Sequence, residues 1–261
     1  MIRRAGILLI LVMTAALSAC STTATDILNI SPVNAPRFGD NDPQDFARSP
    51  STYAVHGIDV SKYQGTIDWN TASAAGVSFA FIKATEGGDM FDPKFEEYWA
   101  GSRAAGIPRS AYHFFYFCRP AIEQVQWYIR NVPRERDALP PVLDMEWNHL
   151  SPTCRLRPPP EKVRSEMQVF LNALERHYGK RPIIYTTIDF HRENIEGHFL
   201  DYPMWLRAVA EHPDTLYPGH SWTFWQYTGT GIVPGITGNT DINVFNGTIE
   251  QWRRWLSNAT S

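Results

Sequence analysis

The sequence predicts an α/β fold, a modified TIM-like β/α barrel whose helices become fewer in the C-terminal third. From Val55 onward, short apolar runs alternate with helical patterns, which is typical of parallel strands joined by helices. The runs are continuously apolar, which indicates a sheet covered on both faces, and eight of them fit closure into a barrel. After Tyr185 the helical patterns fade, so the last third is expected to be irregular.

Residues that suit helix ends punctuate the first part of the barrel. Asp68 and Asp92 suit helix starts, and Gly76, Gly106 and Gly179 suit helix stops. Helices are expected at 68–75, 93–105, 121–131 and 161–178. Strands are expected at 57–61, 79–85, 109–115, 141–146, 182–186, 204–207, 223–227 and 241–244.

Residues 1–19 have the pattern of a lipoprotein signal peptide. Arg3 and Arg4 precede a short apolar stretch that ends in Leu-Ser-Ala before Cys20, which resembles the bacterial lipobox. The resemblance implies lipidation of Cys20 and, with Ser21 next to it, sorting to an outer membrane facing the periplasm. The alternative is an ordinary signal peptide or anchor with an accidental cysteine.

The stretch from Cys20 to about Tyr53 is expected to be a flexible tether. It is rich in Ser, Thr, Pro, Asn and Asp, and its apolar residues are too sparse to offset the entropy of ordering. Such a chain spans on the order of 30 Å. The catalytic barrel is therefore expected at 54–258.

The charge of the chain excludes some classes of partner. The formal net charge is −3, and removal of Arg3 and Arg4 with the signal takes it to −5. No basic stripe is present for nucleic acid or anionic lipid, so membrane attachment would depend on the acyl chains. We expect a monomer without metal or cofactor.

The stretch "PPVLDMEWNH", residues 140–149, places two carboxylates one residue apart on an apolar strand. Side chains two apart share one face, so Asp144 and Glu146 have Cβ atoms roughly 6 to 7 Å apart. Two carboxylates in a partly buried site repel each other as anions, which raises the pKa of at least one. One acid and one base are what glycosidic bond cleavage requires.

Other strand candidates also end in acids, aromatic residues or amides, at the face where barrels carry their chemistry. Rings stack on the apolar faces of sugars, so this pattern favours a sugar-binding site. Two further acids, Asp59 and Asp241, are expected on the first and last strands, which become neighbours when a barrel closes. The expected substrate-binding residues are Lys83, Glu86, Tyr112, Tyr185, Trp205, Trp225, Gln226 and Tyr227.

Each residue type also has a structural interpretation. Asp144, Glu146 and His149 could bind a metal, although a second histidine or further carboxylates would then be expected. The acids could instead pair with arginines, and Lys83 could pair internally with Glu86. Any one of the aromatic residues, taken singly, could belong to the core.

Seven segments together resemble one known family. These are "HGIDVSKYQGTIDW", "FAFIKATEGGDMFDPKFEEYW", "AGIPRSAYHFF", "PPVLDMEW", "PIIYT", "FWQYT" and "TDINVFNG". In this order they resemble glycoside hydrolase family 25, the Chalaropsis-type lysozymes, over about Val55 to Trp255.

The resemblance implies hydrolysis of the β-1,4 bond between N-acetylmuramic acid and N-acetylglucosamine in peptidoglycan. Glu146 matches the family's proton donor and Asp144 the second acid, while Asp59 and Asp241 match its other acids. The resemblance also implies retention of configuration, with the substrate's N-acetyl oxygen as nucleophile in one proposed route. The spacing of the pair does not decide between this route, a direct carboxylate nucleophile and an inverting pair.

Two segments depart from the family pattern, "FYFCRP" after the third expected strand and the insertion "NHLSPTCRLRPPP" after the acidic pair. Both extend from the catalytic face, so a disulfide between Cys118 and Cys154 is expected, with free thiols as the alternative. A binding module without turnover and a hydrolase of another N-acetylated polymer such as chitin are the competing functions.

Overall fold

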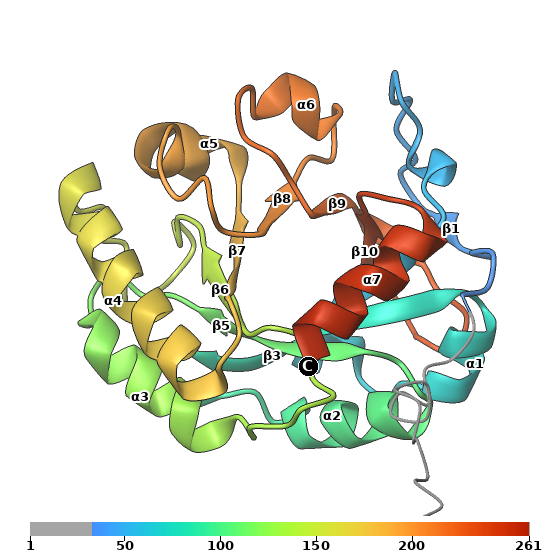
Figure 1. Ribbon diagram of the computed structural model, residues 1–261, viewed down its shortest axis with the longest axis horizontal. Coiled ribbons are helices and arrows are strands. Elements are labelled where there is room, and N and C mark those ends of the chain that lie inside the picture. Colours follow the sequence, from blue (N-terminus) through green and yellow to red (C-terminus); the bar gives the residue numbers. More distant parts are fainter. Residues whose placement is uncertain (1–32, 261) are drawn as a thin grey trace, which may run out of the picture.

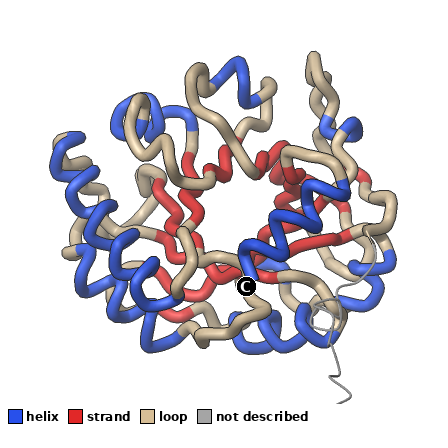
Figure 2. The backbone as a smooth tube through the Cα atoms, viewed as in Figure 1, coloured by secondary structure: helices blue, strands red, loops and turns tan. Residues whose placement is uncertain are grey.

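The computed structural model describes residues 33–260, and within these residues eight strands close into a barrel (Figure 1, Figure 2). The barrel follows the order β10-β2-β3-β5-β6-β7-β8-β9, and β9 returns to β10. These strands are β2 (His56–Val60), β3 (Val77–Glu86), β5 (Arg109–Phe114), β6 (Val142–Met145), β7 (Ile183–Thr186), β8 (Met204–Arg207), β9 (Phe224–Ile232) and β10 (Thr240–Phe245). The predicted α/β barrel is confirmed.

The last strand differs from the expected parallel arrangement. The other seven strands of the barrel pair in parallel with one another, whereas β10 is antiparallel to both β9 and β2. Only residues 233–239 connect β9 to β10, which is too short for a helical crossover, so the chain turns back as a hairpin. The first residues of β10 therefore lie at the carboxyl end of the other strands, and Asp241 pairs with Asp59.

The four predicted helices are present as α1 (Trp69–Ala74), α2 (Phe95–Ala104), α3 (Ala121–Asn131) and α4 (Pro160–Tyr178). Asp68 caps α1 by accepting from the Thr71 amide, and Gly179 ends α4 in the left-handed conformation, as the sequence predicts. After β7 there are short helical turns at α5 (Ile188–Phe190), His191–Ile195 and α6 (Pro213–Leu216).

A final helix, α7 (Ile249–Thr260), was not predicted. It lies across one opening of the barrel (Figure 1). Its buried residues Trp252 and Leu256 join the interior cluster that contains Phe79 and Phe224. The helix therefore covers the amino end of the barrel.

The strands sort their side chains between interior and exterior with a period of two. Phe79, Phe81 and Phe224 fill the interior, whereas Ala80 and Ile82 pack under the outer helices. Gly57 faces inward, where a Cβ atom would lie 2.4 Å from the Phe79 ring. The glycine therefore leaves room for this ring.

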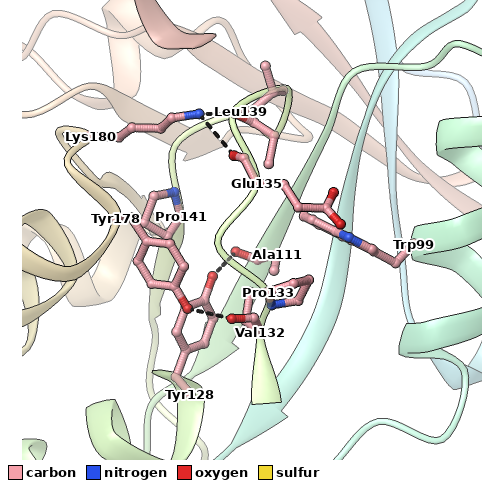
Figure 3. Close-up of a pocket in the computed structure, with 11 residues that line it drawn as sticks. Trp99, Ala111, Tyr128, Val132, Pro133, Glu135, Leu139, Pro141, Tyr178 and Lys180 are labelled. Atoms are coloured by element: carbon pink, nitrogen blue, oxygen red, sulfur yellow. Dashed lines mark hydrogen bonds between the residues drawn. The ribbon is translucent and has the colours of Figure 1, made fainter. Parts of the chain in front are cut away.

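A small cavity of about 10 Å³ lies beneath α2, α3 and α4 (Figure 3). The Tyr128 hydroxyl donates to the Ala111 carbonyl at 2.9 Å, and the Tyr178 hydroxyl donates to the Val132 carbonyl at 3.0 Å. Leu139 and Pro141 also line the cavity, and both precede β6, so it belongs to the amino end of the strands.

The described part of the expected tether, residues 33–53, packs on the barrel. Strand β1 (Gly39–Asp40) pairs with β9, Phe38 packs against His56, and Phe46 packs against Trp225. This differs from a free tether because aromatic side chains of this stretch pack against rings of the barrel. Three smaller elements are the 3₁₀ turns Pro50–Thr52 and Lys62–Gln64 and the strand β4 (Met90–Phe91), which pairs with β3. Within the described part of the chain, none of the helices combines the length and the apolar character needed to span a membrane.

Candidate active site

Four carboxyl groups meet at the end of the barrel opposite α7. Asp59 is on the carboxyl half of β2, Asp144 is on β6, and Glu146 follows that strand by one residue. Asp241 joins them because β10 runs in the opposite direction. Asp59 and Asp144 keep only 7% and 6% of their surface exposed, and Glu146 and Asp241 are half-buried.

Amide side chains hold Asp59 in place. Gln226 donates to Oδ2 of Asp59 at 2.9 Å, and Asn243 donates to the same oxygen at 2.8 Å. The Tyr185 hydroxyl donates to Oε1 of Gln226, and the Trp205 indole donates to Oδ1 of Asn243. Burial followed by the charge of Asp241 raises the pKa of Asp59 well above its usual range, and the two amide donors oppose this.

Asp144 and Glu146 have no ion-pair or side-chain hydrogen-bond partner among residues 33–260. Oδ1 of Asp144 is fully buried without a partner. Burial followed by the charge of Glu146 raises the pKa of Asp144 well above its usual range. Burial also raises the pKa of Glu146, while the positive charges of Arg207 and Lys83 oppose this. Both acids keep some exposure to solvent, and neither forms an ion pair with an arginine of the described chain.

Asp241 completes the group of acids. Burial raises its pKa to about 6, and the charge of Arg207 opposes the shift. Because burial removes hydration from the charged form, this end of the barrel retains protons that exposed carboxyl groups would lose.

Lys83 and Glu86 lie beside the acids but bind each other. Nζ of Lys83 is 2.5 Å from Oε2 of Glu86, and the Tyr116 hydroxyl donates to the other oxygen of Glu86. Lys83 also lies over the Phe114 ring. The internal pair considered from the sequence is present, and the Lys83 charge still lowers the pKa of Asp144 and Glu146.

Three of the predicted aromatic residues point into the barrel at this end. The Tyr185 ring packs 4.4 Å from the Trp205 ring, and Tyr112 packs 6.3 Å from it. Trp205 is 2% exposed and stacks on Phe81 inside the barrel, so it forms the floor of the site instead of a free surface for a sugar ring. Tyr112 is half-buried and Tyr185 is 6% exposed.

Two predicted substrate-binding residues, Trp225 and Tyr227, lie outside the site. Gln226 faces inward, so its two neighbours on β9 face outward. Trp225 is fully buried, donates to the Ala208 carbonyl and packs against aromatic side chains, while the Tyr227 hydroxyl lies 3.3 Å from His56. Consecutive strand residues cannot share one face, so these two predicted substrate-binding residues do not line the acidic end of the barrel.

The structure adds Arg207 and Asn243 to the predicted residues. Arg207 is two residues after Trp205 on β8, and Asn243 is two residues after Asp241 on β10. The same alternation that places Trp205 and Asp241 inside the barrel therefore also places these two inside.

The two departures from the family pattern are linked to each other. Cys118, in the loop after β5, and Cys154, in the loop after β6, form a disulfide. The loop after β6 also contacts the short turn that follows β7, because the Trp147 indole donates to Glu193 at 2.9 Å. Cys20 lies outside the described residues. In residues 33–260, no group of three or more His, Cys, Asp or Glu side chains is arranged to hold a metal ion.

Comparison with known families decides where this barrel belongs. The model of the glycosyl hydrolases family 25 matches residues 58–236. The chain belongs to glycosyl hydrolase family 25. Asp59, Asp144 and Glu146 fall within the matched residues, and Asp241 lies five positions after the last of these residues.

Relatives of this family 25 chain come from several bacteria. An Escherichia coli K12 protein named "Uncharacterized protein YegX" is 37% identical over 215 residues, 80% of this chain and 76% of the relative. Lysozyme M1 of Streptomyces globisporus is 35% identical over 211 residues, 75% of this chain and 69% of the relative.

Solved structures have the same fold. A family 25 glycosyl hydrolase from Bacillus anthracis superposes with a TM-score of 0.71 at 35% identity, covering 82% of this chain and 98% of the other. A lysozyme from Streptomyces coelicolor gives a TM-score of 0.69 at 33% identity, covering 79% of this chain and 97% of the other.

Proposed function

We propose that the protein is a lysozyme-type peptidoglycan hydrolase, an N-acetylmuramidase that cleaves the β-1,4 bond between N-acetylmuramic acid and N-acetylglucosamine. The main support is the pair Asp144 and Glu146, a buried and a half-buried carboxyl group without ion pairs at the carboxyl end of a barrel. Membership of family 25 and a relative named as a lysozyme support the same substrate.

Glu146 is the proposed proton donor. Protonation of the leaving oxygen requires an acid that is still neutral near the working pH, and burial raises the pKa of Glu146 in this direction. Once the bond has broken, the Glu146 carboxylate takes a proton from the attacking water.

Asp144 is proposed to act on the substrate's acetamide. In the unliganded protein, burial and the charge of Glu146 favour the neutral form of Asp144. An acetamide N–H donated to the unpartnered Oδ1 would stabilise the carboxylate and favour the proton on Glu146 instead. The oriented acetamide oxygen can then attack the sugar carbon, which gives retention of configuration.

Asp59 and Asp241 are proposed to complete the catalytic group by adding negative charge where a positive sugar centre develops. Tyr112, Tyr185 and Gln226 are the predicted substrate-binding residues with the best placement, because all three face the site. Trp205 supports the rings from below.

The proposal includes the place of action. An exported lipoprotein, attached through Cys20 to the outer membrane and facing the periplasm, would meet peptidoglycan there. The support is the signal-like pattern of residues 1–20.

The proposed function predicts that Glu146→Gln removes turnover and leaves the fold intact. The amide cannot supply a proton, so we expect a loss of about 10²- to 10⁴-fold in kcat. The measurement is digestion of purified peptidoglycan, with mass spectrometry of the reducing ends and a melting curve of each variant.

The matched control is Glu196→Gln, which changes an exposed glutamate in the turn after His191–Ile195. It should keep wild-type turnover. New reducing ends that carry N-acetylglucosamine instead of muramic acid, or full activity in Glu146→Gln, would overturn the assignment. Binding of peptidoglycan without turnover by the wild type would indicate a binding module.

A further inference from the structure

Arg207 is a cation at the acidic end of the barrel to which no role has yet been given. It ends β8, pairs along the backbone with Gln226 of β9, and faces the interior in register with Trp205. Its side chain is half-buried. Its positive charge lowers the pKa of Glu146, Asp241 and Asp59, so it lies near all three.

The guanidinium has no hydrogen-bond or ion-pair partner among the side chains and backbone of residues 33–260. None of the nearby acids has a carboxylate oxygen within 4.0 Å of its guanidinium nitrogens. Arg109, a buried arginine elsewhere in the barrel, pairs with both Glu135 and Asp137. Lys83, the other cation beside the acids, pairs with Glu86. The donors of Arg207 are therefore open toward the site.

A cation at this position works against the proposed reaction. The reaction proposed above develops positive charge on a sugar, which a neighbouring guanidinium opposes. An arginine that only neutralised the acids would be expected to form a close ion pair with one of them, because the guanidinium fork matches a carboxylate. The open fork fits an anionic or strongly accepting group on the substrate instead.

We propose that Arg207 is a specificity-determining residue that binds the carboxyl oxygens of the lactyl side chain of muramic acid. This inference rests on the proposed function and names the part of the substrate that the site recognises. The two sugars of the glycan differ only in this group, a three-carbon ether that ends in a carboxyl carbon. In the free acid it offers a carboxylate, and in the peptide-linked form it offers an amide carbonyl.

The planar fork of arginine gives this contact its selectivity. A carboxylate accepts two parallel N–H bonds, whereas an amide carbonyl accepts at one oxygen. N-acetylglucosamine carries only a hydroxyl at that position and leaves the guanidinium without its acceptor. The site should therefore bind the muramic acid best, its amide less well and N-acetylglucosamine least.

The test is a titration of the wild-type protein with single sugars, followed by NMR. The probes are N-acetylmuramic acid, its lactyl amide and N-acetylglucosamine. We expect the wild type to bind the muramic acid at least about tenfold more tightly than N-acetylglucosamine, as for a charge-assisted contact. Arg207→Gln should remove most of this preference.

Two further variants separate recognition from general electrostatics. Arg207→Lys keeps the positive charge but lacks the fork, so it should retain the pH profile of turnover and lose the preference for the free acid over the amide. Arg192→Gln removes an exposed arginine from the neighbouring turn and should leave the preference unchanged.

Equal binding of the sugars by the wild type, or an unchanged preference in Arg207→Gln, would overturn the inference. The titration measures binding and does not depend on turnover. Failure of the wild type to cleave peptidoglycan would therefore contradict the proposed function, whereas equal binding of the sugars by the wild type, or an unchanged preference in Arg207→Gln, would contradict only the role of Arg207.

Discussion

Each of the four acids is harder to ionise in this barrel than in water, and burial is the largest cause for all of them. Ionisation is opposed because the charged form loses hydration that the protein only partly replaces. Asp59 receives two amide donors in compensation, but Asp144 has a buried oxygen with none. Burial of these acids therefore lowers the stability of the fold at the site where the reaction is proposed to take place.

Asp241→Asn should stabilise the folded protein above neutral pH. The pKa of Asp241 is raised to about 6 from an ordinary value of 3.8, so its ionisation opposes folding as the pH rises between these values. The free-energy cost of ionising Asp241 in the folded protein is absent below about pH 4 and complete above about pH 6. We expect the variant to gain about 1–3 kcal/mol in unfolding free energy at pH 8 and nothing at pH 3.5. Urea unfolding at both pH values measures this.

Asp45→Asn is the matched control, because Asp45 is exposed in the N-terminal segment. It should change the unfolding free energy by less than about 0.5 kcal/mol at either pH. A gain for Asp241→Asn that is the same at pH 3.5 and pH 8 would show that electrostatic strain is not its origin.

At the level of single residues, the two-residue periodicity of strands explains which predicted site residues face the interior of the barrel. It places Asp144 and Glu146 on one face from sequence alone, and the structure has both inside the barrel. The same rule excludes Trp225 and Tyr227 once Gln226 faces inward, and it leads from Trp205 to Arg207. What the sequence could not show is that Arg207 has no partner, because this depends on where Asp59, Glu146 and Asp241, acids from distant parts of the chain, come to lie.

Among the elements, the loops after β5 and β6 shape one side of the acidic end. The disulfide joins them across 36 residues of sequence, and Tyr116, two residues before Cys118, contacts Glu86. The bond therefore fixes the loop whose tyrosine holds the Lys83–Glu86 pair.

Replacing both cysteines, Cys118→Ala with Cys154→Ala, should lower the unfolding free energy by about 2–4 kcal/mol, because the unfolded chain loses a crosslink over this loop length. Urea unfolding measures the change. Reductant should produce the same loss in the wild type and have no further effect on the double variant. Equal stability of all these forms would mean that other contacts already hold the two loops.

Element prediction succeeded where local pattern and fold agree. Asp68 caps α1, and glycines follow the ends of α1, α2 and α4, as the sequence predicts, whereas α3 has neither signal. The direction of β10 and the presence of α7 depend on how the barrel closes. In α7, the apolar residues Ile249, Trp252 and Leu256 have a helical spacing. Their packing partners lie at the amino end of the barrel, however, and these partners come together only when the barrel closes.

Considered as a whole, the molecule has two different ends. α7 covers the amino end of the strands, and the acids occupy the carboxyl end. The described chain starts beside the amino end, because Asn34 donates to the Ser73 carbonyl and Arg37 donates to the Ala74 carbonyl, just before β3 begins. A lipid anchor at Cys20 would be connected at this end, so the proposed anchor leaves the acids free to face away from the membrane.

This polarity, together with the proposed lipidation, predicts a specific behaviour of Cys20→Ser. The variant cannot accept acyl chains, so it should move from the detergent-extracted membrane fraction to the soluble fraction and lose labelling by palmitate. Its turnover of soluble peptidoglycan fragments should stay within about twofold of the wild type, because residues far from the site seldom change chemistry. Thr23→Ala, in the same segment, should remain with the membrane.

Digestion of intact sacculi by cells should fall in Cys20→Ser alone. The thirteen peptide units from Cys20 to residue 33 reach at most about 45 Å, so the anchor keeps the enzyme near the wall. Membrane retention of Cys20→Ser would contradict the lipid anchor, and a matching loss of activity on soluble fragments would contradict the separation of anchor and active site.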